Sequence, residues 1–139
     1  MTPADPYAAG RMDQLTNVAA WYLFQGVANF IVFERLLAPR FLGRAAEESA
    51  IAAGLPKARI VFEVLARELG AQPYFVGSAI TLADALIVPH LDFFTEAPEW
   101  EPLAAPHANL RAWVERMRAR PSMAATTREH VAAKAQQAA

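Results

Sequence analysis

Four stretches of the chain carry apolar side chains at the three- and four-residue spacing that places them on one face of a helix. These stretches predict helices over residues 6–38, 56–69, 82–95 and 109–120, with a short helix or a tail after residue 121. No stretch is typical of a β-strand. We therefore predict an all-α fold in which residues 1–139 form a single domain, a helical bundle of about five helices.

Cap and breaker residues set the ends of the predicted helices. Asp5 and Pro6 open the first helix as a cap followed by a proline at the first helical position. This helix then meets no further proline before Pro39. Gly70 ends the second helix in the favoured position after its last turn, and Pro121 ends the fourth because it pushes the preceding residue out of helical space. The segment EAPEWEPLAAPHA is predicted to be a loop.

The third predicted helix begins within the segment YFVGSAITLADALIVPHL, residues 74–91, where several signals agree. The Thr81 hydroxyl can cap the helix, and the Asp84 carboxylate can accept a hydrogen bond from the Thr81 N–H, which makes a capping box. Gly77 supplies a turn before the helix. Pro89 falls inside it, where a proline tends to kink the axis. A capping box alone predicts only that a helix begins here.

The first predicted helix contains a run without charge, QLTNVAAWYLFQGVANFIVF at residues 14–33. A membrane span needs about 20 mostly apolar residues, but polar side chains are spread around this helix, and Asp13 and Glu34 bound it closely. A buried helix is the better interpretation, because polar groups are costly in lipid. Its apolar surface exceeds the single stripe that a small bundle buries. We therefore expect a second stripe to face another domain, a second subunit or a ligand.

Composition narrows the class of protein further. Hydrophobic residues make up 55% of the chain, which excludes a disordered protein. The net charge of −1 provides no general attraction to nucleic acid or to an anionic membrane. The chain contains no cysteine, so it has no disulfide, thiolate metal site or cysteine nucleophile. The first residues lack the basic and apolar segments of a signal peptide, and a cytoplasmic protein is expected.

Two motifs, in this order along the chain, resemble those of the glutathione transferase family. The segment around Thr81, Asp84 and Pro89 resembles the central buried helix of the family's C-terminal domain, with Ser78 in place of an Asp that often follows the glycine. The segment HANLRAWVERMRARPSMAAT resembles the family's penultimate helix, and its Trp113 fits the tryptophan of that pattern. The resemblance covers essentially the whole chain. It implies the all-helical C-terminal domain of a glutathione S-transferase.

The resemblance also implies where the chemistry of such a protein resides. Full-length members hold glutathione on an N-terminal thioredoxin-like domain, which carries the residue that stabilises the thiolate. No βαβ pattern is present in this sequence, and Glu48 and Ser49, which resemble the family's Glu-Ser pair, follow no strand, so that match is interpreted as coincidence. We therefore expect no catalytic residue here and no cofactor bound by this chain alone. Glutathione is implied as the co-substrate of a presumed full-length protein.

The implied substrate-binding residues lie on the first helix. Trp21, Tyr22 and Phe24 are candidates to line the pocket for the electrophile, a hydrophobic small molecule; for each, core packing or a subunit interface is the alternative. Gln25 and Asn29 are polar residues within an apolar run and need partners if they are buried. They face the absent domain, a ligand or the twin subunit of a homodimer. The carboxylate with which family members often reach across the dimer is not found in this run.

Other kinds of site receive little support. His90, His107 and His130 show no ligand-like spacing with one another or with a carboxylate cluster, so no metal site is predicted. The arginines of residues 111–120 fall late in a helix, where cations suit the helix dipole, and this favours a solvated helix end over a nucleic-acid surface.

Two functions remain open from the sequence. The first is the helical half of a glutathione-conjugating transferase, which supplies the apolar wall of the electrophile site and the dimer surface and is inactive without the thioredoxin-like domain. The second is a free-standing interaction module, because domains that resemble this one also assemble complexes of translation factors and aminoacyl-tRNA synthetases. The transferase class and the electrophile are not specified by the sequence.

Overall fold

The computed structural model describes residues 1–137, and within this range it contains helices and no β-strand. The last two residues of the predicted domain lie outside the described range. The elements are α1 (Pro6–Asn17), η1 (Val18–Leu42), α2 (Glu48–Leu69), α3 (Leu82–Phe94), α4 (Trp100–Ala104), α5 (Ala108–Arg118), α6 (Pro121–Ala125) and α7 (Arg128–Gln137). The all-α class predicted from the sequence is confirmed.

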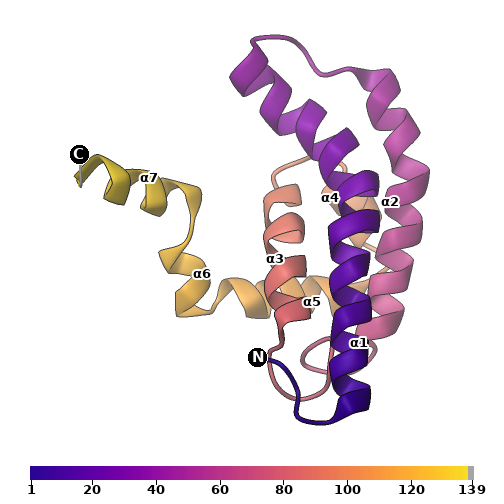
Figure 1. Ribbon diagram of the computed structural model, residues 1–139. Helices are drawn as coiled ribbons and strands as arrows, with labels where there is room; N and C mark the ends of the chain where they lie inside the picture. Colours follow the sequence, from indigo (N-terminus) through magenta and orange to yellow (C-terminus); the bar gives the residue numbers. More distant parts are fainter. Residues whose placement is uncertain (138–139) are drawn as a thin grey trace.

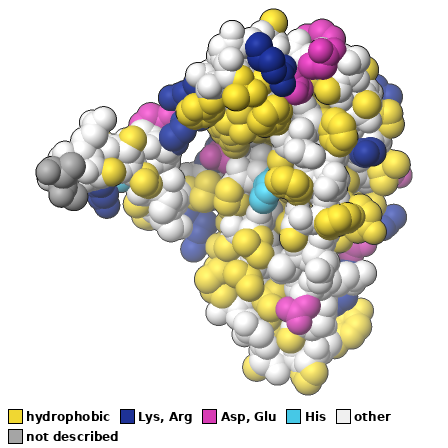
Figure 2. Space-filling model, turned by 45° about the horizontal axis from the view of Figure 1, so that its top comes forward, with side chains coloured by type: hydrophobic (Ala, Val, Ile, Leu, Met, Phe, Trp, Pro, Cys, Tyr) yellow, Lys and Arg dark blue, Asp and Glu magenta, His cyan; other side chains and the backbone are white. Residues whose placement is uncertain are grey.

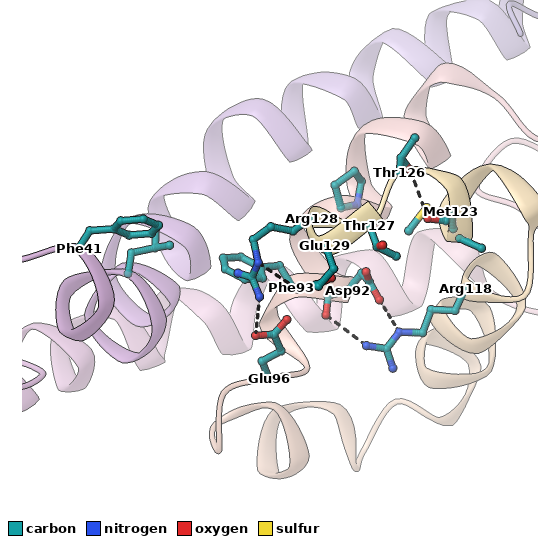
Figure 3. Close-up of a pocket in the computed structure, with 13 residues that line it drawn as sticks. Phe41, Asp92, Phe93, Glu96, Arg118, Met123, Thr126, Thr127, Arg128 and Glu129 are labelled. Carbon is teal, nitrogen blue, oxygen red and sulfur yellow. Dashed lines mark hydrogen bonds and ion pairs between the residues drawn. The ribbon is translucent and has the colours of Figure 1, made fainter. Parts of the chain in front are cut away.

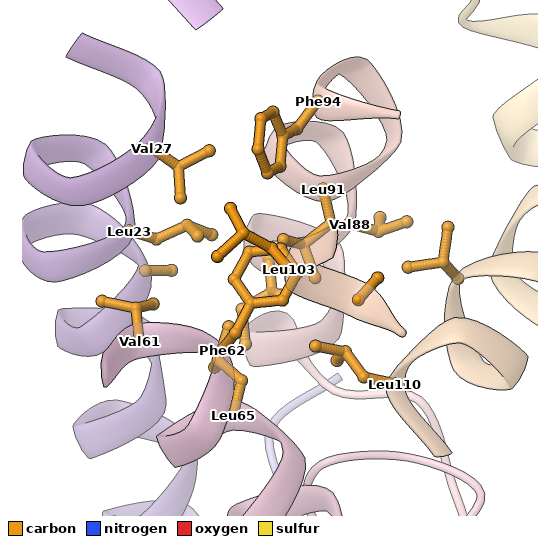
Figure 4. Close-up of a cluster of buried hydrophobic side chains, with 14 of the residues drawn as sticks. Leu23, Val27, Val61, Phe62, Leu65, Val88, Leu91, Phe94, Leu103 and Leu110 are labelled. Atoms are coloured by element: carbon orange, nitrogen blue, oxygen red, sulfur yellow. The ribbon is translucent and has the colours of Figure 1, made fainter. Parts of the chain in front are cut away.

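The helix formed by α1 and η1 runs beside α2 and α3, and α5 crosses one end of this group (Figure 1). From α5, the short helix α6 and then α7 lead the chain away from the bundle on the side of α3 (Figure 1). The core lies between the long helices and is filled by aliphatic and aromatic side chains (Figure 4). Fully buried members include Leu23, Val27, Phe62, Leu91 and Phe94.

The first helix begins as predicted from its cap. The Asp5 carboxylate accepts a hydrogen bond from the Ala8 N–H at 2.8 Å, with Pro6 in the first turn. From Val18 the helix continues with the wider hydrogen bonding of a π-helix, and it passes the predicted end at residue 38. Pro39 removes one donor near the last turn, and the helix ends only before Gly43, whose φ of 63° lies in the left-handed region.

By length and composition alone, the continuous helix Pro6–Leu42 is long and apolar enough to cross a membrane. Core helices of soluble proteins can be equally long and apolar. In this helix, 39% of the most apolar stretch is buried inside the fold. One face of the helix carries Leu23, Val27 and Ile31, spaced by four residues and fully buried. Its burial pattern is therefore that of a helix packed on other helices along part of its circumference.

Helix α2 begins eight residues earlier than predicted, at Glu48, and Pro56 lies inside it. Tertiary packing explains the difference. Ile51 is buried, and Gly54 lies so close to η1 that a Cβ atom there would be 2.6 Å from the Cβ of Phe30. The segment before Pro56 therefore packs onto η1 as a helix, and this contact outweighs the local cost of the proline.

The segment predicted as a loop between α3 and α5 contains α4, Trp100–Ala104. Trp100 is buried, and its ring packs edge-on against Phe62 at 5.7 Å and against Phe94 at 6.1 Å between ring centroids. A helix of five residues has little stability of its own. This turn forms because Trp100 is buried, and no local sequence pattern predicts that burial.

Candidate functional site

A cavity of about 930 Å³ lies where the end of η1, the second half of α3 and the α5–α7 region meet (Figure 3). Its lining consists of Leu37, Phe41, Pro89, Asp92, Phe93, Glu96, Arg118, Met123, Ala124, Thr126, Thr127, Arg128 and Glu129. Its volume falls in the range of small-molecule sites, which combine an apolar wall with a few polar groups. This cavity is the candidate functional site.

Apolar side chains from three elements form one part of the wall. Leu37 and Phe41 stand four residues apart on η1, and Pro89 and Phe93 stand four residues apart on α3. Each pair therefore presents the same face of its helix to the cavity. Met123 from α6 adds a flexible thioether side chain. In the space-filling view, hydrophobic side chains are visible on the bundle next to the projecting arm that α6 and α7 form (Figure 2). An apolar ligand would be covered on several sides here.

Two arginines and three carboxylates form the charged part of the wall. The Arg118 guanidinium donates a hydrogen bond to the Asp92 carboxylate (Figure 3). It also donates one to the Thr95 hydroxyl. Arg128 approaches Glu96 at 3.6 Å and Glu129 at 3.3 Å. Its guanidinium carbon also lies 5.1 Å from the centroid of the Phe93 ring. The lining thus carries one carboxylate more than it carries guanidinium groups.

Charge at the start of α7 is held by local contacts. The backbone N–H of Glu129 itself lowers the pKa of the Glu129 carboxyl, and the Arg128 side chain lowers it further. The carboxylate is therefore ionised at neutral pH. Because it sits in the first turn of α7, it also suits the positive end of the helix dipole.

The structure places the sequence-predicted binding residues outside this cavity. Trp21, Tyr22 and Phe24 are exposed to 63%, 60% and 44%. Trp21, Gln25 and Asn29 are spaced by four residues and share one outward face of η1. Even Phe24 precedes Leu37 by thirteen residues, which places these side chains roughly 15–20 Å along the helix from the cavity.

The cavity residues that sequence reasoning missed are Leu37 and Phe41 on η1, Phe93 on α3 and Met123 on α6. A signal for the first two was present, since the apolar character of the first helix continues past Glu34 to Phe41. No signal predicted the cavity itself, because its lining comes from three separate segments, residues 37–41, 89–96 and 118–129, and only the fold brings them together.

The two sequence motifs meet at one buried carboxylate. Asp84 has no exposed surface, and its Oδ2 accepts hydrogen bonds from the N–H and the hydroxyl of Thr81, both at 2.9 Å. The capping box at the start of α3 is present. Asp84 Oδ1 accepts the Phe75 N–H at 3.0 Å and the Trp113 Nε1–H at 3.1 Å. This carboxylate therefore joins the loop before α3, the first turn of α3 and α5.

A second buried carboxylate holds the loop after η1. Both Glu34 oxygens accept from the Arg44 guanidinium, at 2.6 and 2.8 Å, and one also accepts the Glu47 N–H at 2.9 Å. These bonds, Arg44 first and Glu47 next, lower the pKa of Glu34 to about 2. Arg35 beside it binds Glu99 at 2.6 Å and also binds Glu48. Together, the contacts of Glu34 and Arg35 link the end of η1 to the start of α2 and to the loop before α4.

Several other charged or polar side chains lie in structural contacts. Arg116 donates to the Pro73 carbonyl at 2.9 Å, and Arg120 donates to the Tyr74 hydroxyl at 3.3 Å. His90 Nδ1 lies 3.0 Å from the Leu86 carbonyl oxygen. Among the described residues, no group of three His, Cys, Asp or Glu side chains is close enough together to hold a metal ion.

Solved structures of similar shape define the class of fold. Glutathione transferase F2 from Populus trichocarpa matches with a TM-score of 0.79 at 20% identity, over 94% of this chain and 60% of that chain. The apo form of glutathione S-transferase III matches with a TM-score of 0.77 at 27% identity, over 94% of this chain and 57% of that chain. The fold is thus that of the helical part of these proteins.

The family model for the glutathione S-transferase C-terminal domain matches residues 27–121. The chain therefore belongs to this family, and the resemblance seen in the sequence is confirmed. Among curated relatives, glutathione S-transferase F14 from Arabidopsis thaliana is 27% identical over 124 residues, which are 88% of this chain and 48% of the relative. The chain spans about half the length of the curated relatives it matches.

Proposed function

We propose that this chain is the helical half of a glutathione-conjugating transferase and that its cavity forms the apolar wall of the electrophile site. The observation that carries the proposal is the cavity itself, in which Phe41 of η1, Phe93 of α3 and Met123 of α6 converge. A hydrophobic small molecule is the chemistry that such a wall accommodates. The residues proposed for this role thus shift along η1 from Trp21, Tyr22 and Phe24 towards Leu37 and Phe41.

The second reactant has to be supplied from elsewhere. Conjugation needs a nucleophilic thiolate held beside groups that lower its pKa, and this chain contains no cysteine. In the proposed function the thiol is that of glutathione, held and activated by a thioredoxin-like domain in the same protein. The chain alone is then expected to bind the electrophile without converting it.

The outward face of η1 has a separate role in this proposal. Trp21 and Tyr22 are largely exposed, although isolated domains gain little from bare aromatic side chains at neighbouring positions. We propose that this face, with Phe24, Gln25 and Asn29, is covered by the thioredoxin-like domain or by the second subunit of a homodimer. Its distance from the cavity separates assembly from electrophile binding.

Binding and turnover of an apolar aryl chloride test the proposal together. Calorimetric titration should show binding to the chain, and Phe41→Ala should weaken that binding about three- to tenfold, because the bound ligand would lose the ring surface that it covers. Tyr7→Ala, which removes a ring exposed to 78% outside the cavity, is the matched control and should leave the affinity unchanged. Added glutathione should give no conjugate.

Two results would contradict the proposal. Equal effects of Phe41→Ala and Tyr7→Ala would show that the cavity is not the binding wall. Turnover by the chain alone would show that thiol activation does not need the second domain. Conjugation by a fusion of a relative's thioredoxin-like domain before residue 1 would support the proposal that this domain activates the thiol while the helical chain binds the electrophile.

A free-standing interaction module is the alternative function. The specific observation in its favour is the exposed aromatic pair Trp21 and Tyr22, which lies well away from the cavity. In that case a partner protein would cover this face, and the cavity would have no role in it. An aryl chloride would then fail to bind, whereas Trp21→Glu would abolish assembly.

A further inference from the structure

Arg128 lies over the Phe93 ring at the cavity, and Arg40 lies over the Phe41 ring with its guanidinium carbon 5.7 Å from the centroid. The Arg128 guanidinium carbon lies 5.1 Å from the centroid of the Phe93 ring, and Arg128 Nη2 lies 3.6 Å from Glu96 Oε2 (Figure 3). A ring face attracts cations that lie within about 6 Å of its centroid. Phe93 and Glu96 therefore form two sides of a cation site, and the chain fills this site with its own side chain.

The contacts of Arg128 are loose in comparison with those of the other cavity arginine. Charge-assisted hydrogen bonds are typically about 2.7–2.9 Å long, whereas Arg128 stands 3.3 Å from Glu129 and 3.6 Å from Glu96. Arg118, in contrast, is bonded to Asp92 and to Thr95. The Arg128 side chain also keeps 40% of its surface exposed. It is the cation that a ligand can displace.

The helix that carries Arg128 is held weakly as well. Helix α7 begins at this residue, contains no buried side chain and packs against the short helix α6 (Figure 1). Few buried apolar contacts mean a low free energy of local opening. Movement of Arg128 out of the cavity therefore disturbs little of the core.

Charge in the cavity decides which ligands gain from this movement. The lining holds Asp92, Glu96 and Glu129 against Arg118 and Arg128, so carboxylates are in excess by one. Once Arg128 leaves, Glu96 lacks the cation that now pairs with it, whereas Glu129 still has the positive charge of Arg40 nearby. A positively charged ligand replaces it, whereas an anionic ligand meets like charges.

We propose that the cavity selects apolar ligands that carry a positive charge, an aryl or alkyl ammonium or guanidinium group, which binds Phe93 and Glu96 in place of Arg128. This inference rests on the proposed function, in which the cavity binds a small apolar molecule. It adds the charge of that molecule. In this arrangement Arg128 is an internal competitor that a matching cation displaces and other ligands do not.

Three ligands with a common naphthyl body test the charge preference by calorimetric titration of the whole chain. They are naphthylmethyl-trimethylammonium, naphthylmethanol and naphthalenesulfonate, which are cationic, neutral and anionic. The cation is expected to bind most tightly. Arg128→Ala should raise its affinity about three- to tenfold, because the internal competitor is removed. Glu96→Gln and Phe93→Leu should each lower it about three- to tenfold.

Matched controls come from an exposed ion pair outside the cavity. Arg111 and Glu101 stand 3.1 Å apart at the surface, and neither lines the cavity. Arg111→Ala and Glu101→Gln change the net charge as the test variants do, and they should leave all three affinities within twofold. Thermal unfolding of each charge variant should match that of the parent chain, since every substituted charge is at least partly exposed.

Arg128→Ala distinguishes a cavity that selects cations from one that selects anions, because the ligand affinities change differently in the two cases. If the cavity selects anions through Arg128, this variant weakens naphthalenesulfonate and leaves the cation unimproved, which overturns the inference. If naphthylmethanol binds in a Phe41-dependent manner but the cation binds no better, the inference fails and the proposed function stands. If none of the three ligands binds, the proposed electrophile wall itself is refuted.

Discussion

Trp113 donates its indole N–H to the Asp84 carboxylate at 3.1 Å, and both side chains are completely buried. The two residues are 29 positions apart, one on α5 and one in the first turn of α3. The Phe75 ring packs edge-on against Trp113, with 5.0 Å between ring centroids, and the Phe75 N–H binds the same carboxylate oxygen. The Asp84 carboxylate, which caps α3 locally, thus also links α3 to the loop before it and to α5.

Asp84→Ala is expected to lower the free energy of unfolding by about 3–4 kcal/mol, more than the loss of a cap alone. The reason is that the donors of Thr81, Phe75 and Trp113 would be left buried without an acceptor. Asp84→Asn keeps one acceptor oxygen and should cost about half as much. Urea denaturation followed by circular dichroism measures both.

Asp13→Ala is the control for that experiment, because Asp13 is exposed, and its effect should stay within about 0.5 kcal/mol. A loss below about 1 kcal/mol for Asp84→Ala would mean that the buried donors find other acceptors and would contradict the role of this carboxylate.

Gly54→Ala and Gly10→Ala should change stability in opposite directions. At Gly54 the new Cβ would lie 2.6 Å from the Phe30 Cβ, so α2 and η1 would have to separate, at a cost of about 1–3 kcal/mol. At Gly10, inside α1, nothing lies within 4 Å of the added carbon, and alanine should stabilise the helix by about 0.5–1 kcal/mol. Denaturant midpoints compare the two. Equal effects would mean that α2 does not approach η1 so closely.

Glu34 should give the chain a dependence of stability on acid. Its pKa is lowered from 4.5 to about 2, chiefly by the Arg44 side chain and then by the Glu47 N–H. A carboxyl whose folded pKa is depressed contributes stability above its unfolded pKa and loses it as the pH falls through the folded value. The contribution should therefore be complete above about pH 4.5 and decline between pH 4.5 and pH 2.

Unfolding of the parent chain and of Glu34→Gln as a function of pH measures this contribution. Between pH 4.5 and pH 2 the stability of Glu34→Gln should decline less steeply. Arg44→Ala removes the main cause of the shift and should flatten the same region. Parallel curves for all three proteins would show that the Arg44 contact does not persist in solution.

Trp21→Glu should reduce self-association of the chain. Trp21 is 63% exposed on the outward face of η1, where the proposed assembly surface lies, and a charge is costly in a buried interface. Sedimentation velocity over a range of concentrations measures the effect. Tyr7→Glu places the same charge at another exposed aromatic position, on α1, and should leave the association state unchanged. A parent chain that stays monomeric at high concentration would contradict the assigned surface.

Local signals in the sequence were sufficient where one turn of chain holds its own partners. The cap at Asp5, the capping box of Thr81 and Asp84, and the stop before Pro121 are contacts between residues about three positions apart, so their residue types predict them directly. Helical spacing likewise predicted the all-α class, because one buried face per helix leaves a periodic pattern.

Contacts between distant segments decided the rest. The start of α2 at Glu48 follows from the fit of Gly54 against Phe30, and α4 follows from the burial of Trp100 between Phe62 and Phe94. The cavity is a further case, because Phe41, Phe93 and Met123 belong to three elements whose approach leaves no trace in the local pattern.

The sequence alone determined the all-helical class, the family motifs and the excess of apolar surface on the first helix, since these depend on residue type and spacing. Only the tertiary structure decided which part of this apolar surface lines the cavity and which part lies away from it. It left Trp21 and Tyr22 exposed on one stretch of η1, and it placed Leu37 and Phe41, the latter still 68% exposed, in the wall of a cavity. The physical reason is that a helix repeats its faces along its whole length, and only the neighbours packed against each turn determine what that face meets.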